Sequence, residues 1–125
     1  MRILLDTHIF LWAVSGDRKL SKKAQQLILD ASEVYVSAAT IWEISIKAGL
    51  DKIEADVDEL IAEIGAAGFR ELPVTNAHAA AVRNLPDHHR DPFDRLLVAQ
   101  AITEPLRLLS ADEHVWKYSD LVIQA

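Results

Sequence analysis

Short apolar runs alternate along the chain with segments in which apolar residues recur every three to four positions. A short apolar run predicts a buried strand, and the recurring pattern predicts an amphipathic helix. The predicted strands cover residues 3–5, 34–36, 69–74, 106–109 and 121–123. Pro73 makes the third of these the weakest, because proline cannot donate a hydrogen bond to a neighbouring strand.

Helices are predicted in the intervals between these strands. One helix is capped by Ser21 and has apolar positions 24, 27, 28 and 31 on one face. Two more cover residues 40–48 and 57–64, and a fourth runs from Pro92 to about Thr103. Gly49 is expected to end the helix over residues 40–48. Strands alternating with helices predict an α/β fold, in which helices flank both faces of a mostly parallel five-stranded sheet. We expect a single domain over residues 1–125.

Composition supports a globular protein, since 50% of the residues are hydrophobic and 26% are charged. The chain has no cysteine, which excludes disulfides and thiolate metal sites and favours a reducing compartment. No apolar stretch approaches the length of a membrane span, and no signal-peptide pattern precedes the first apolar run. We therefore expect a cytoplasmic protein that does not contact a membrane.

Two predicted helices, the one already given for residues 40–48 and a further one that includes residues 9–14, carry more apolar surface than one core-facing stripe requires. Residues 9–14 are apolar on every side, and residues 40–48 show a second apolar stripe that includes Trp42 and Ile46. Two explanations stay open at this stage. The helices are either deeply buried or carry a face for a partner or a second copy of the chain.

Four acidic residues lie where the predicted elements reach one edge of the sheet. Asp6 ends the first strand, Glu43 follows the second, Asp94 lies in the first turn of the helix that begins at Pro92, and Asp112 follows the fourth strand. Parallel α/β sheets bind ligands beyond the carboxyl ends of their strands. These four residues are therefore the candidate catalytic site.

Each acid also has a structural explanation, because helix starts favour acidic residues as caps and as partners of the helix dipole. Asp6 and Asp91 are candidate helix caps. Thr40–Glu43 and Ser110–Glu113 are candidate capping boxes, the second with Asp112 in the first turn of its helix. Lys47 and Arg95 are candidate ion-pair partners of Glu43 and Asp91 respectively. Asp91 is interpreted as structural for this reason.

Acids at four such positions together are better explained by a divalent cation. Carboxylates gathered at one edge raise one another's pKa and repel unless a cation neutralises them. The absence of cysteine and of an H-E-x-x-H motif disfavours zinc, whereas an oxygen-only ligand set suits Mg²⁺ or Mn²⁺. Such sites activate water for attack on phosphorus, so phosphoryl or phosphodiester chemistry is predicted.

Four sequence blocks carry a family resemblance over nearly the whole chain. They are "LLDTHIFLWA", "VSAATIWEISIKAGL", "RDPFDRLLVAQA" and "LLSAD", and they contain all four candidate acids. In this order they resemble the signature blocks of PIN-domain ribonucleases, in particular the VapC-type toxins of toxin–antitoxin pairs. The resemblance implies a parallel five-stranded sheet, Mg²⁺- or Mn²⁺-dependent cleavage of RNA, a homodimer and an antitoxin that blocks the site.

The family's catalytic acids map onto Asp6, Glu43, Asp94 and Asp112. We assign Asp6 and Asp94 as direct metal ligands and Glu43 as the residue that orients or deprotonates the attacking water. Asp112 either binds the metal directly as a further ligand or interacts with it through a water molecule. Thr7 and Ser110 are left as residues that position phosphate or water, or as plain helix-start hydroxyls.

The net charge of −6 argues against unspecific nucleic-acid binding. Several cationic residues lie near the acids in the sequence: Lys47 and Lys52 after Glu43, and Arg90 and Arg95 on either side of Asp94, with His88 and His89 before Arg90. They either form a local positive rim or are ordinary surface charges. The five histidines show no metal-binding spacing, and His88 and His89 are expected to be exposed. Two alternative functions stay open: a catalytically silent binding module of the same fold and, less favoured, a receiver domain that accepts phosphate on an aspartate.

Overall fold

The computed structural model describes residues 1–125 and contains one sheet of five parallel strands in the order β3-β2-β1-β4-β5. The strands are β1 (Arg2–Leu5), β2 (Glu33–Ser37), β3 (Arg70–Leu72), β4 (Arg107–Ser110) and β5 (Val122–Gln124). All five predicted strands are confirmed. The third is shorter than predicted and ends directly before Pro73, whose ring nitrogen has no hydrogen to give to the sheet.

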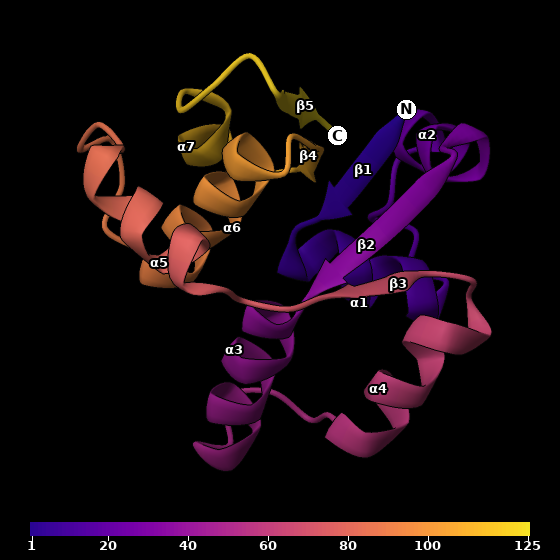
Figure 1. Cartoon of the computed structure of the whole chain (residues 1–125). Coiled ribbons are helices and arrows are strands. Elements are labelled where there is room, and N and C mark those ends of the chain that lie inside the picture. The colour runs from indigo at the N-terminus through magenta and orange to yellow at the C-terminus, as the bar shows by residue number, and fades with distance from the viewer.

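Helices cover both faces of this sheet, as Figure 1 shows with α5, α6 and α7 on one side and α1, α2 and α4 on the other. The helices are α1 (Thr7–Ser15), α2 (Lys22–Asp30), α3 (Ala38–Gly49), α4 (Val57–Ala66), α5 (Asn76–Ala81), α6 (Pro92–Thr103) and α7 (Glu113–Trp116), with a 3₁₀ turn at Val82–Asn84. The predicted α/β fold is therefore confirmed. The short helix α5 was not predicted, because it offers too few turns to show a period, whereas a helix near α7 was predicted from the helix-start signals after the fourth strand.

Alternating side chains of the central strand divide the core into two clusters. Ile3 and Leu5 pack with α1 and α2, whereas Leu4 packs on the other face against Leu97 and Val98 of α6. All three strand residues have no exposed surface. Each such side chain contributes about 1.5–3 kcal/mol of burial free energy, so this pattern holds the carboxyl end of β1 firmly in place.

Helix caps were predicted correctly in three places and wrongly in three. Asp6, Ser21 and Asp91 cap α1, α2 and α6 as expected. The two predicted capping boxes are wrong, because Ser37 caps α3 and Asp112 itself caps α7. Gly49 is the last residue of α3 and not the residue after its end.

The two apolar helices α1 and α3 differ in how much of their apolar surface is buried. Ile9 and Phe10 of α1 are fully buried, so that helix is largely part of the core. On α3 the side chains of Trp42 and Ile46 are 58% and 38% exposed, and Leu50 beyond its end is 61% exposed. The spare apolar stripe predicted for this helix therefore faces outward. No helix has the length and apolar character needed to cross a membrane.

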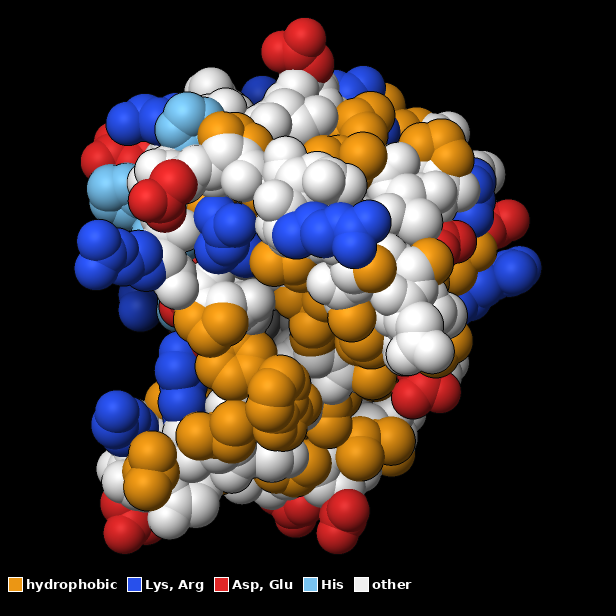
Figure 2. Space-filling model, turned by 60° about the vertical axis from the view of Figure 1, so that its left-hand side comes forward, with side chains coloured by type: hydrophobic (Ala, Val, Ile, Leu, Met, Phe, Trp, Pro, Cys, Tyr) orange, Lys and Arg blue, Asp and Glu red, His pale blue; other side chains and the backbone are white.

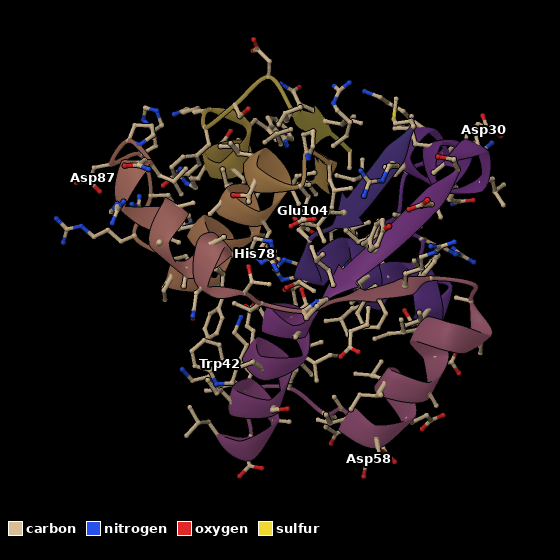
Figure 3. The ribbon with its side chains drawn as sticks, in the orientation of Figure 1. Asp30, Trp42, Asp58, His78, Asp87 and Glu104 are labelled. Atoms are coloured by element: carbon tan, nitrogen blue, oxygen red, sulfur yellow. The ribbon has the colours of Figure 1, made fainter.

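His78 is a buried titratable residue that belongs to the packing of α5 on α6. Its Nδ1 accepts a hydrogen bond from the Thr75 amide, and its Nε2 lies 2.5 Å from the Glu104 carboxylate (Figure 3). Gln100 of α6 completes the contact with an amide nitrogen 3.3 Å from Nδ1. These bonds fix the chain between β3 and α6 without adding to the acidic cluster.

Candidate active site

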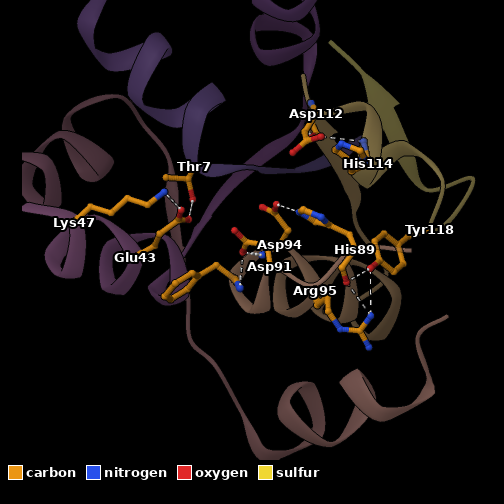
Figure 4. Close-up of polar contacts among 12 residues, drawn as sticks. Thr7, Glu43, Lys47, His89, Asp91, Asp94, Arg95, Asp112, His114 and Tyr118 are labelled. Carbon is orange, nitrogen blue, oxygen red and sulfur yellow. Dashed lines mark hydrogen bonds and ion pairs between the residues drawn. The ribbon is translucent and has the colours of Figure 1, made fainter. Parts of the chain in front are cut away.

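The carboxyl edge of the sheet gathers acidic side chains from distant parts of the chain. Because β1 and β4 are parallel neighbours, their ends at Leu5 and Ser110 lie on the same edge. Asp6 directly follows β1, and Asp112 follows β4 by two residues. Glu43 on α3 and Asp94 in the first turn of α6 lie at the same edge, as Figure 4 shows for Glu43, Asp94 and Asp112.

Asp6 is a buried carboxylate held by the helix that it caps. Its side chain accepts a hydrogen bond of 2.8 Å from the Ile9 amide, and the residue is only 4% exposed. Burial raises the pKa of Asp6, and the charge of Asp112 adds to the rise. Hydrogen bonds from Ser110 and the Ile9 amide oppose it. An ionised Asp6 is therefore stabilised by a nearby cation.

Glu43 is also buried, with 4% exposure, and two donors fix its oxygens. Thr7 Oγ1 donates to Oε1 at 2.7 Å, and Lys47 Nζ donates to Oε2 at 2.6 Å (Figure 4). The pair with Lys47 was predicted as an ordinary surface contact, but only its lysine reaches solvent. The local reason is that Ser37 caps α3, which places Glu43 in the second turn of the helix with its side chain directed inward.

Asp94 is a second carboxyl group of the cluster whose ionisation is disfavoured. Its pKa is raised to about 6, chiefly by burial and then by the charges of Asp91, Asp6 and Glu43, while a hydrogen bond with His89 opposes the rise. His89 Nε2 lies 3.0 Å from Asp94 Oδ2. A carboxyl group that resists ionisation beside other acids has the electrostatics of a cation site.

Asp112 completes the cluster from the β4 side. Its Oδ1 accepts a hydrogen bond of 2.9 Å from the His114 amide, as the cap of α7. One ligand atom each from Asp112, Asp94 and His89 lies within 4.8 Å of the other two. The structure thus brings Asp94 and Asp112 together. The other predicted ligand, Asp6, and the predicted base, Glu43, lie outside this group of three but close enough for their charges to raise the pKa of Asp94.

His89 is the site residue that sequence reasoning missed. It was expected to be exposed, but its side chain is only 24% exposed and points at Asp94 (Figure 4). Its ring stacks on that of His114 with centroids 5.3 Å apart and planes 12° apart. The one available signal was a histidine five residues before Asp94 in the segment that leads into α6. His88 is exposed, as predicted.

Arg95 has a structural role that differs from the predicted pair with Asp91. Its guanidinium donates to the carbonyl oxygens of Val82, Pro86 and His89 and to the hydroxyl of Tyr118. The Tyr118 hydroxyl in turn donates to the His89 carbonyl at 2.9 Å. Asp91 instead caps α6. Arg95 therefore holds the segment that carries His89 and is not free to bind phosphate.

The donor chemistry of the site fits a hard divalent cation. The cluster offers carboxylate oxygens from four elements, two of which have raised pKa values that a bound cation would lower. Cations such as Mg²⁺ take one or two protein carboxylates and complete their shell with water and phosphate. The arrangement suits metal-assisted chemistry on a phosphate ester better than nucleophilic catalysis, because no serine–histidine pair accompanies it.

The fold and this cluster define an α/β protein with a carboxylate site at the carboxyl edge of a parallel sheet. The chain matches the PIN domain family over residues 3–121, and it belongs to that family. Ribonuclease VapC22 of Mycobacterium tuberculosis is 31% identical over 116 residues, covering 90% of this chain and 88% of that protein.

Solved structures with the same fold include two toxin–antitoxin assemblies. VapBC2 from Rickettsia felis, bound to a promoter DNA fragment, aligns with a TM-score of 0.69 at 14% identity over 100% of this chain and 98% of that one. A toxin–antitoxin complex from Klebsiella pneumoniae aligns with a TM-score of 0.67 at 18% identity over 98% and 96% of the two chains. These likenesses confirm the fold predicted from the sequence.

Proposed function

We propose that this protein is a metal-dependent endoribonuclease that hydrolyses RNA phosphodiester bonds and acts as a toxin restrained by a cognate antitoxin. The observation that carries the proposal is the convergence of Asp6, Glu43, Asp94 and Asp112 at one edge of the sheet. The sequence identity to a VapC ribonuclease supports the same reaction. The cytoplasm is the compartment in which such an enzyme meets RNA.

Asp6 and Asp94 are the proposed direct ligands of Mg²⁺ or Mn²⁺, with Asp112 beside Asp94 as a further oxygen donor. When bound, such an ion supplies Lewis-acid activation of water and neutralises charge at the scissile phosphate. The protein's part is to hold these oxygens in place: the Ile9 amide fixes Asp6, and the His114 amide fixes Asp112.

Glu43 is the proposed group that orients the attacking water and accepts its proton. Its two oxygens are held by Thr7 and Lys47, so its position does not depend on the metal ligands. A fixed carboxylate at hydrogen-bonding distance from the water is the requirement for general-base catalysis. Lys47 has a raised pKa, chiefly from its hydrogen bond to Glu43, and stays a cation beside it.

RNA binding to a chain of net charge −6 requires cations close to the site. Figure 2 shows Lys and Arg side chains bordering the face on the side of α3, α5 and α6. Arg90 and Lys52 are exposed and available to phosphates, whereas Lys47 is bonded to Glu43 and Arg95 to backbone carbonyls. The proposed positive rim therefore rests on fewer residues than the sequence suggested.

Two apolar surfaces support the proposed protein partners. A cavity of about 380 Å³ lies between α1 and residues 53–63, with Trp12 and Leu60 in its wall and Asp17, Glu54 and Glu59 beside them. We propose that this groove accepts part of the antitoxin. The exposed apolar residues at α3, on the lower part of Figure 2, are the proposed contact of a homodimer.

A cleavage assay on total RNA tests the enzymatic proposal. We expect cleavage with Mg²⁺ or Mn²⁺, none with a chelator, and none after Asp6→Asn or Asp94→Asn. Asp30→Asn is the matched control, because Asp30 is an exposed acid on α2 (Figure 3). Co-expression with the small protein encoded beside it should suppress wild-type cleavage. Full activity in either site variant would remove the proposed mechanism.

Separate outcomes distinguish the two alternative functions. Tight binding of the antitoxin without any RNA cleavage under any divalent cation would favour the silent binding module. The strand order β3-β2-β1-β4-β5 disfavours a function as a receiver domain, since receiver domains have the strand order 2-1-3-4-5. A stable aspartyl phosphate after incubation with a small phosphodonor would reinstate it.

A further inference from the structure

A ring nitrogen of His89 faces the same space as the acidic oxygens. It lies within 4.8 Å of the ligand atoms of Asp94 and Asp112, and Nε2 is 3.0 Å from Asp94 Oδ2. Metal–ligand bonds of about 2.1 Å place two ligands of one ion at most about 4.2 Å apart. Small side-chain rotations therefore bring all three atoms onto one ion.

The imidazole is held in this position by contacts that do not involve the acids. The His89 carbonyl accepts hydrogen bonds from Tyr118 and Arg95, and the ring stacks on His114. A histidine kept only as a hydrogen-bond partner of Asp94 would need no such support. Preorganisation of a ring from both its backbone and its face is what a metal ligand requires.

We propose that His89 is a nitrogen ligand of the divalent ion held by Asp94 and Asp112, and that this mixed site prefers Mn²⁺ to Mg²⁺. The inference rests on the proposed metal-dependent function and goes beyond it by adding a ligand and a metal preference. Mg²⁺ is a hard ion that binds oxygen and keeps its waters, whereas imidazole suits transition-metal ions.

Pulsed electron paramagnetic resonance of the Mn²⁺-loaded protein tests the ligand directly. Wild type should show ¹⁴N coupling to Mn²⁺, and labelling with [¹⁵N]histidine should replace it with ¹⁵N coupling. His89→Gln should abolish the coupling. His88→Gln is the matched control and should keep it, because His88 is exposed and its ring packs on Tyr118.

Calorimetry tests the metal preference. Wild type should bind Mn²⁺ more tightly than Mg²⁺, and His89→Gln should weaken Mn²⁺ binding by roughly tenfold or more, with a smaller effect on Mg²⁺. Circular dichroism reports whether His89→Gln folds. Should it not fold, histidine coupling that persists in each of the variants His8→Gln, His78→Gln, His88→Gln and His114→Gln assigns the ligand to His89, the remaining one of the five histidines.

The outcomes separate this inference from the proposed function. Mn²⁺ binding without nitrogen coupling, or coupling that persists in folded His89→Gln, overturns the inference and leaves a carboxylate-only metal site. Equal affinity of wild type for Mg²⁺ and Mn²⁺ overturns the preference. Absence of Mn²⁺ and Mg²⁺ binding overturns both the inference and the metal-dependent function.

Discussion

The hydroxyl of Thr7 donates a hydrogen bond of 2.7 Å to the carboxylate of Glu43 and so ties the start of α1 to α3. Thr7 directly follows Asp6 in the chain, so this bond links a proposed metal ligand to the proposed base. Both residues of the bond are buried. This bond, together with a contact of 3.3 Å between the hydroxyls of Thr7 and Thr40, helps to hold the two acids in position relative to each other.

Replacing Thr7 by valine should impair both catalysis and stability. Valine keeps the shape but removes the donor from a buried carboxylate, which costs about 1–3 kcal/mol of unfolding free energy. Loss of such an orienting bond lowers activity by roughly 10–100-fold. RNA cleavage rates and thermal melting measure the two effects. Thr7→Ser keeps the hydroxyl and should stay near wild type, whereas a fully active Thr7→Val would show that Glu43 needs no such support.

Asp94→Asn should stabilise the protein when a chelator is present, while abolishing cleavage. The raised pKa of about 6 means that ionised Asp94 is disfavoured in the fold, and an amide removes this charge. The side chain is 19% exposed, so we expect a gain of roughly 1–3 kcal/mol at pH 7. His89 can still donate to the amide oxygen. Chemical denaturation measures the change, and a destabilised variant would contradict the electrostatic account.

The same ionisation predicts how stability depends on pH. The pKa of Asp94 is raised from 3.8 to about 6, so the folded state binds a proton more readily than the unfolded state between these values. Its contribution to stability is therefore fully present below about pH 4 and lost as pH rises through 6. Both proteins are denatured in chelator from pH 4.5 to pH 7.5. The unfolding free energy of wild type should fall relative to that of Asp94→Asn as the pH rises. Parallel curves would exclude Asp94 as the group responsible.

Local sequence signals account for the parts of the site that were predicted. The start of α6 follows from Asp91 and Pro92, a cap and a first-turn residue whose preferences act within one turn. Asp6 was placed correctly because a cap directly after a buried strand is also a local pattern. The gathering of the acids followed from the parallel sheet, which the alternation of strands and helices predicts.

The parts that were missed depend on contacts between distant residues. Both Ser37 and Thr40 are suitable helix caps, and the choice of Ser37 is supported by its buried hydrogen bond of 2.6 Å to Gln100, 63 residues away. That choice decides that Glu43 points inward. The proximity of His89 to Asp112 likewise depends on how the segment before α6 packs against α7, which no local pattern encodes.

Arg95→Lys should loosen the segment that presents His89. The guanidinium bonds several carbonyl oxygens and the Tyr118 hydroxyl at once, and a lysine ammonium cannot reproduce this planar set of donors. We expect a loss of about 1–3 kcal/mol and faster amide hydrogen exchange in residues 84–91. Tyr118→Phe removes fewer bonds and should have a smaller effect. Unchanged exchange in Arg95→Lys would show that the segment is held by other contacts.

Trp42→Glu should convert the proposed homodimer to a monomer. Trp42 is 58% exposed and lies edge-on to Phe93 with ring centroids 5.0 Å apart, next to the exposed Ile46 and Leu50. A stable interface buries about 800 Å² on each partner and tolerates a charge at its apolar centre poorly. Light scattering should give twice 13.9 kDa for wild type and 13.9 kDa for the variant. Leu29→Glu is the matched control, because Leu29 is an exposed apolar residue on α2, outside this patch, and should leave the dimer intact. A dimer that survives Trp42→Glu but not Leu29→Glu would move the interface to α2, and a wild-type monomer would leave the apolar surface of α3 to a different partner.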